Sequence, residues 1–153
     1  MGATLLAVVV AGTRAFWLSV GDSPLFHFRA GALTQLNDDH SLAPQIDMLV
    51  EAGLLDAESA LTHPNRNTLT SAVVGTEIPK IDCPQKPASL QSGDILIAAS
   101  DGIQFLSGEE LEHTLICHEQ LSSAELVNQI LDKLHQLEIP DLDNIGVALI
   151  RCH

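Results

Sequence analysis

Basic residues are scarce in this chain. Only 7 Lys and Arg stand against 20 Asp and Glu, which gives a formal charge of −13 over 153 residues. Such a surface repels nucleic acid and anionic membranes, so we expect neither as a partner. Cysteine is also rare, with three residues at long spacings and no CxxC pair. This excludes a disulfide framework and predicts a cytoplasmic protein.

Long apolar runs are missing as well. Residues 5–11 resemble the apolar part of a signal peptide, but no basic segment precedes them and no clear cleavage site follows. The run is too short to span a bilayer, and we interpret it as a buried strand. Aromatic residues make up 3% of a chain that is 46% hydrophobic, so aliphatic side chains must fill the core. The length predicts a single domain over residues 1–153.

The hydrophobic pattern predicts an α+β fold built on antiparallel sheet. Closely spaced strands with turn residues between them indicate a meander over residues 3–10, 15–20, 25–29 and 33–36. Later strands are expected at 68–74, 79–83, 94–99 and 145–150. Helical spacing from Ile46 ends at Gly53, and Asp56 can cap a short helix. Two Ser-x-x-Glu capping boxes, at Ser107 and Ser122, begin the last two helices.

Two carboxylates flank the two apolar runs at 95–99 and 145–150, which we expect to be buried strands. Asp101 comes directly after the first run, and Asp143 precedes the second. Neighbouring strands would bring both to one sheet edge, where carboxylate oxygens suit Mg²⁺ or Mn²⁺. Ordinary turn chemistry remains the alternative for both, and for Asp22 in "VGDSP".

A second pair of potential ligands lies outside this pattern. His113 and Cys117 are four residues apart on an expected helix and can share one face. A zinc site uses three or four ligands, so this spacing favours a packed cysteine instead.

Several segments, in this order, resemble the PP2C-type metal-dependent serine/threonine phosphatases, in particular the bacterial ones. The matching segments are "VGDSP", "LTQLNDDHSL", "HPNRNTLTSAVVG", "GDILIAASDGI" and "DLDNIGVALI". The resemblance covers nearly the whole chain. It implies a sandwich of two antiparallel sheets flanked by helices, with a binuclear Mg²⁺ or Mn²⁺ centre between the sheets. Metal-activated water in that family hydrolyses phosphoserine or phosphothreonine esters of a phosphoprotein.

The resemblance also assigns residues. Asp101 and Asp143 stand where the family has two metal-binding aspartates, and Asp22 stands where an additional metal binds. Pro24 replaces the usual arginine after Gly-Asp-Ser, and Phe105 replaces an aspartate that supports the additional metal. These two departures weaken the prediction for Asp22. No catalytic residue beyond the metal ligands is predicted.

The family's N-terminal strands and helices have no counterpart in these 153 residues. That part carries a phosphate-binding arginine and an Asp-Gly-x-Gly-Gly whose carboxylate bridges the metals, and no such motif occurs here. We therefore expect a partial domain, corresponding to the C-terminal half, with negligible phosphatase activity alone. Open sheet edges predict a homodimer or a complex with a separately encoded N-terminal half. The alternative is a non-catalytic binding module that acts through protein association.

Overall fold

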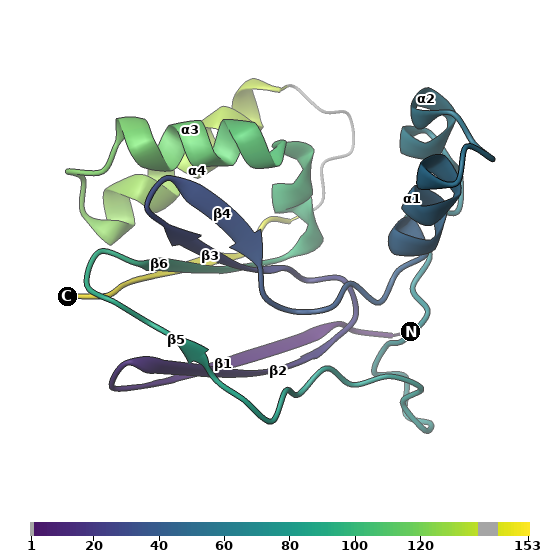
Figure 1. Ribbon diagram of the computed structural model, residues 1–153, viewed down its shortest axis with the longest axis horizontal. Helices are drawn as coiled ribbons and strands as arrows, with labels where there is room; N and C mark the ends of the chain where they lie inside the picture. The colour runs from purple at the N-terminus through teal and green to yellow at the C-terminus, as the bar shows by residue number, and fades with distance from the viewer. Residues whose placement is uncertain (1, 138–143) are drawn as a thin grey trace.

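The computed structural model describes residues 2–137 and 144–153, which form two antiparallel sheets with helices on one side (Figure 1). The first sheet has the order β1-β2-β5, with β1 at Leu5–Ala11, β2 at Arg14–Val20 and β5 at Ala88–Ser89. β1 and β2 form a hairpin paired along its full length, from Leu5 opposite Val20 to Ala11 opposite Arg14.

The second sheet has the order β4-β3-β6-β7, and all its neighbours are antiparallel. Its strands are β3 at Leu25–Arg29, β4 at Ala32–Gln35, β6 at Ile95–Ala99 and β7 at Val147–Arg151. β6 lies in the middle and is apolar on both faces. Leu96 faces the first sheet, whereas Ile95 and Ile97 face the helices. This two-sided burial explains the continuous apolar sequence of β6 and confirms the prediction of a fully buried strand.

Two helices cover the outer face of the second sheet (Figure 1). They are α3 at Gly108–Cys117 and α4 at Ser123–Gln136, and both predicted capping boxes are formed. α4 places Leu126, Ile130 and Leu134 in the main core, where each is fully buried. In this part of the chain the helical period of the sequence therefore gives the observed packing.

The remaining helices form an arm beside the sheets (Figure 1). α1 spans Ala43–Glu51 and α2 spans Ala57–Leu61, and Asp56 caps α2 as expected. The 3₁₀ helix η1, Asp101–Phe105, follows β6. Within the described ranges, no helix has both the length and the apolar character needed to cross a membrane.

The predicted meander is wrong in one respect. β2 and β3 are consecutive, but the turn between them carries the chain from one sheet to the other. The strands expected at 68–74 and 79–83 are also absent from the described structure. There, only isolated bridges form, at Leu69, Val73 and Asp82. β7 was expected to be buried, yet it is a half-exposed strand at a sheet edge.

Candidate functional site

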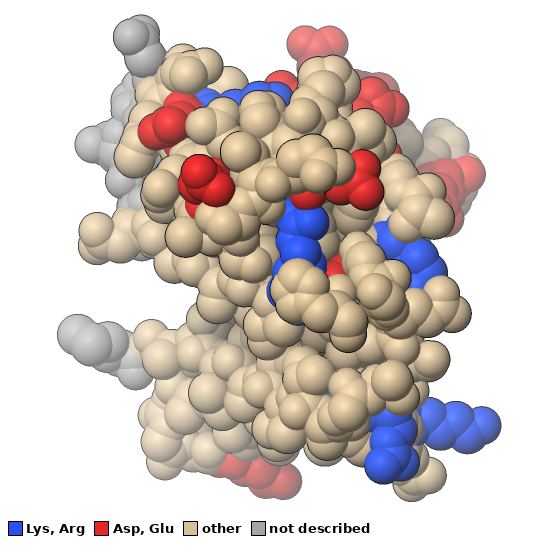
Figure 2. All heavy atoms as spheres, turned by 90° about the vertical axis from the view of Figure 1, so that its left-hand side faces the viewer, with Lys and Arg blue, Asp and Glu red and all other residues tan. Residues whose placement is uncertain are grey.

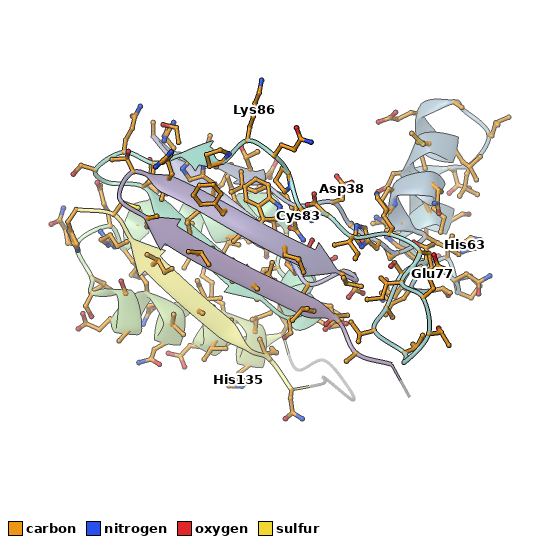
Figure 3. All side chains as sticks on the ribbon, turned by 90° about the horizontal axis from the view of Figure 1, so that it is seen from below. Asp38, His63, Glu77, Cys83, Lys86 and His135 are labelled. Carbon is orange, nitrogen blue, oxygen red and sulfur yellow. The ribbon has the colours of Figure 1, made fainter. Side chains whose placement is uncertain are left out.

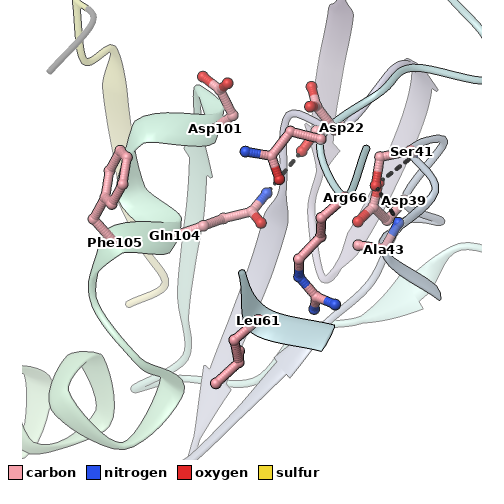
Figure 4. Close-up of a pocket in the computed structure, with 10 residues that line it drawn as sticks. Asp22, Asp39, Ser41, Ala43, Leu61, Arg66, Asp101, Gln104 and Phe105 are labelled. Atoms are coloured by element: carbon pink, nitrogen blue, oxygen red, sulfur yellow. Dashed lines mark hydrogen bonds between the residues drawn. The ribbon is translucent and has the colours of Figure 1, made fainter. Parts of the chain in front are cut away.

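A pocket of about 310 Å³ lies where the arm meets the ends of the two sheets (Figure 4). Three carboxylates, Asp22, Asp39 and Asp101, contribute to its wall. The other lining residues are Ser41, Ala43, Leu61, Arg66, Asn67, Gln104 and Phe105. Two of the three aspartates predicted from the sequence, Asp22 and Asp101, thus share one pocket although they are far apart in the chain.

Asp22 lies in the turn that leads from β2 to β3. Gly21 takes a positive φ of 104°, and a side chain there would collide with Thr4, so this turn requires glycine. His40 holds the turn from the other side. Its backbone N–H donates to the Gly21 carbonyl, and its Nδ1 accepts from the Gly21 N–H at 3.2 Å. This fixed turn points Asp22 into the pocket.

Asp22 as a whole residue is 9% exposed. Burial raises its pKa to about 6, and the nearby negative charge of Asp101 adds to the increase. Gln104 donates to the Asp22 backbone carbonyl at 3.1 Å and not to the carboxylate. A cation in the pocket would therefore relieve an unfavourable concentration of negative charge.

Asp101 is exposed at the first residue of η1, just beyond the end of β6. The following Gly102 has a packing reason to be glycine, since a Cβ there would lie 2.9 Å from Ile145. This close approach lets η1 begin directly at the strand end and brings Asp101 to the pocket (Figure 4).

Asp143 lies outside the described residues, so its predicted role as a ligand stays a prediction. The chain just after it is held beside Asp101. Ser100 N–H donates to the Gly146 carbonyl at 2.9 Å, and Gly146 N–H donates to Ser100 Oγ at 3.0 Å. β6 and β7 are neighbours in the same sheet, as the prediction required.

Asp39, Arg66 and Gln104 are among the pocket residues that were not predicted individually. Asp39 and Arg66 come from the "DDHS" and "HPNRN" segments, and that resemblance was the available signal. The Arg66 guanidinium forms a bidentate ion pair with the carboxylate of Asp47 on α1, with N–O distances of 2.7 and 3.0 Å. No sequence pattern pointed to Gln104 as a pocket residue, because its position depends on the 3₁₀ turn after β6.

The donor chemistry of the pocket suits a hard divalent cation, since carboxylate oxygens dominate it. The donor number is low, however. Among residues 2–137 and 144–153, no group of three His, Cys, Asp or Glu side chains could hold a metal ion. The described residues thus fit part of a metal site and do not complete one.

No family model matches this chain. It is 33% identical over 98% of its length to a protein phosphatase 2C-type protein of Streptococcus pyogenes, and it spans 58% of that relative. It is also 33% identical to the serine/threonine phosphatase stp of Listeria monocytogenes, of which it spans 56%. The chain therefore covers little more than half the length of these relatives.

Solved structures agree with the sequence comparison. The serine/threonine phosphatase of S. agalactiae matches the whole chain with a TM-score of 0.84 and 30% identity, over 60% of its own length. The Mycobacterium tuberculosis phosphatase PstP/Ppp matches with a TM-score of 0.72 and 27% identity, over 61% of its length. The catalytic domain of PstP, in complex with two manganese ions, matches with a TM-score of 0.63 and 26% identity.

Proposed function

We propose that this chain, which is similar in sequence and fold to bacterial PP2C-type serine/threonine phosphatases, forms part of a phosphatase centre that hydrolyses phosphoserine or phosphothreonine. The observation that carries the proposal is the shared pocket of Asp22 and Asp101. Their carboxylates come from the ends of different strands and stand together at one edge of the fold.

In this proposal Asp101 and Asp143 hold Mg²⁺ or Mn²⁺, and Asp22 contributes to an additional ion. The bound metal supplies an activated water and stabilises the charge of the phosphoryl group. The residues of this chain position the ligands. His40 fixes the turn that carries Asp22, and the Gly102–Ile145 contact fixes the start of η1. Residues outside these 153 supply the bridging carboxylate and the phosphate-binding arginine.

The chain alone is therefore proposed to have negligible activity. With p-nitrophenyl phosphate and Mn²⁺, we expect turnover at the level of the buffer. Turnover that Asp101→Ala abolishes would contradict this part of the proposal.

Complementation tests the phosphatase function itself. The chain would be produced together with the part of the S. pyogenes relative that it does not match. We expect Mn²⁺-dependent turnover that falls at least about 100-fold in Asp101→Asn, because a metal ligand is lost. Glu77→Gln, which lies away from the pocket lining, serves as the matched control. A complex that assembles without turnover would favour the non-catalytic binding module instead.

The second part of the proposal concerns the partner. β1 and β7 each pair on one side only in the part of the chain that the structure describes, and they run along the same side of the molecule (Figure 3). Between them lies an apolar cavity of about 230 Å³ lined by Leu6, Val8, Leu25, Leu96, Ala98, Ala148 and Ile150. This places an open apolar seam between two unpaired strand edges.

Two further cavities extend this seam. One shares Leu6, Ala98 and Ala148 with it, and the other shares Ile150. The three together form a groove along both edge strands, and the outline in Figure 2 is indented between the two layers. Apolar side chains on the outer face of the first sheet are also exposed to solvent, with Val9 62% and Phe16 37% exposed. We propose that a polypeptide segment adds a strand to each sheet at this groove.

A further inference from the structure

Two groups of potential ligand side chains stand out in this chain, and their surroundings differ. His113 and Cys117 are both exposed on the surface of α3, so the packed cysteine expected from the sequence is wrong. Two donors on one turn of helix are also too few for a zinc site. Asp22, Asp39 and Asp101, by contrast, line the pocket at the ends of the two sheets.

Asp22 lacks a compensating charge in this pocket. It is 9% exposed, and within the described part of the chain no other residue donates a hydrogen bond to its carboxylate. A buried carboxylate without a partner is costly, and the nearby charges of Asp101 and Asp39 add to the cost. Arg66 is the one cation among the lining residues that the structure describes, and it bonds to Asp47 instead. The pocket therefore carries an excess of negative charge that a bound cation would neutralise.

The other walls of the pocket favour an organic cation over a single metal ion. Among residues 2–137 and 144–153, no three His, Cys, Asp or Glu side chains are placed to hold one metal ion. Leu61 and Phe105 also line the pocket, and they are 73% and 52% exposed. A leucine side chain and a phenyl ring offer no ligand to a metal, whereas both can pack against the methylene groups of a basic side chain.

We propose that this pocket binds an arginine side chain of a polypeptide partner. The guanidinium lies at Asp22 and Asp39, and the aliphatic stem lies against Leu61 and Phe105. In Figure 4 the two carboxylates stand on one side of the pocket and Phe105 stands on the other. Arginine fits better than lysine, because a planar guanidinium has five N–H donors and can bond to two carboxylates at once. The charge of −13 on the chain also favours a basic partner.

This inference goes beyond the proposed phosphatase function and does not rest on it. A guanidinium can bind whether or not the pocket belongs to a phosphatase centre, and its binding is measured without turnover. The guanidinium takes the position next to Asp22 that was proposed for an additional metal ion, so the two are alternative occupants of that position.

Titration of the full chain by nuclear magnetic resonance, with a chelator present, tests the proposal. The probe is N-acetyl-arginine N-methylamide, which carries the guanidinium as its only charge. Burial raises the pKa of Asp22 to about 6, so the titration is done above pH 7, where this carboxylate is ionised. We expect saturable shifts of the backbone amide signals of Asp22, Asp39 and Gln104, which border the pocket. The uncharged N-acetyl-citrulline N-methylamide should bind at least about tenfold more weakly, because the charge-assisted bonds are lost.

Substitutions in the pocket separate the charge from the apolar wall. Asp22→Asn and Asp39→Asn should each weaken binding of the arginine analogue at least about tenfold. Asp39→Asn keeps the side-chain oxygen that accepts from the Ser41 N–H at 2.8 Å, so the local turn is retained. Phe105→Ala should weaken binding about threefold, because the contact with the ring is lost.

Matched variants elsewhere provide the controls. Asp132→Asn removes an exposed carboxylate on α4, and Phe16→Ala removes an exposed ring on the first sheet. Neither should change the titration, and the spectrum of each variant shows whether it is folded. Equal binding of the arginine and citrulline analogues, an absence of saturable shifts at the pocket, or unchanged binding in folded Asp39→Asn would overturn the proposal.

Discussion

Two aspartates in this chain are both buried, yet their environments move their pKa values in opposite directions. Asp94 is 2% exposed and receives bonds from Arg29, at 2.9 and 2.6 Å, and from the Gln91 N–H, at 2.8 Å. The Arg29 guanidinium holds the pKa of Asp94 well below its usual range. Asp22 has no such partner and faces Asp101, so burial raises its pKa. Asp94 thus stabilises the fold, whereas the charge on Asp22 is available for a ligand.

Asp22 should make the metal-free fold less stable as the pH rises. Its pKa in the fold, about 6, is above the ordinary value of 3.8, so folding favours the protonated form. The contribution of Asp22 to the free energy of unfolding should fall between pH 4 and pH 6 and then level off. One proton limits the slope to about 1.4 kcal/mol per pH unit.

Urea unfolding with a chelator present measures this dependence in the unaltered chain and in Asp22→Asn. The difference between the two should change over this pH range and be constant above it. A constant difference from pH 4 to pH 7 would show that the pKa of Asp22 is not raised.

Asp94 should show the opposite dependence on pH. Asp94→Ala leaves Arg29 and His27 without their common partner, and we expect a loss of about 3 kcal/mol at pH 7. Because the pKa of Asp94 is lowered in the fold, this contribution is present above its ordinary pKa and shrinks as the pH falls below about 4. Urea unfolding of the unaltered chain and of Asp94→Ala, at pH 7 and below pH 4, measures this difference in the free energy of unfolding.

The exposed pair of Arg66 and Asp47 is the matched control. The Asp47 side chain is 54% exposed, so Asp47→Ala should cost less than about 1 kcal/mol. An equal cost for both substitutions would mean that burial does not distinguish the two ion pairs.

At the scale of elements, the sequence predicted correctly those features that depend on residues close together in the chain, such as the start of a helix. The capping boxes at Ser107 and Ser122 satisfy the backbone of their own helices, so residues within one turn determine where each helix begins. The segments at 68–74 and 79–83 have strand composition, yet they form only isolated bridges, at Leu69, Val73 and Asp82. Asp82 pairs with Ser19 in an isolated bridge, and Asp82 Oδ2 also accepts from Trp17 Nε1 at 2.9 Å. Contacts of this kind leave no periodic pattern in the sequence from which they could be predicted.

The arm of α1 and α2 should be the least protected helical part of the described fold. Its buried apolar residues are Ile46 and Ala60, whereas Met48 is 66% and Leu54 is 75% exposed. Few buried contacts oppose local opening, so amide hydrogen exchange in α1 and α2 should be at least about tenfold faster than in α4. Equal protection of the two regions would contradict this, and mass spectrometry after peptide digestion resolves them.

At the scale of the molecule, the site was predicted in part because its residues follow strand ends. The predicted neighbours were Asp101 and Asp143, whose strands do lie side by side, whereas Asp22 was assigned to an additional metal by the resemblance alone and the structure places it in the same pocket as Asp101. The switch of the chain between sheets at Gly21 could not be read from composition, since the same turn residues also form hairpins. Gln104 and Arg66 depend on how η1 and the arm meet, which is a tertiary property.

The groove between β1 and β7 should make the isolated chain associate in solution. Its apolar lining and two unpaired edges favour association, but a charge of −13 on each copy opposes it. We therefore expect dimers at micromolar concentration in sedimentation. The dimer should become tighter as salt is added, because salt screens the repulsion between the two copies. Ala148→Lys places a charge within the groove and should give monomers. Leu54→Lys, at a side chain 75% exposed on the arm, should leave the dimer unchanged. A monomeric unaltered chain, or dimers that persist in Ala148→Lys, would mean that this groove does not drive self-association.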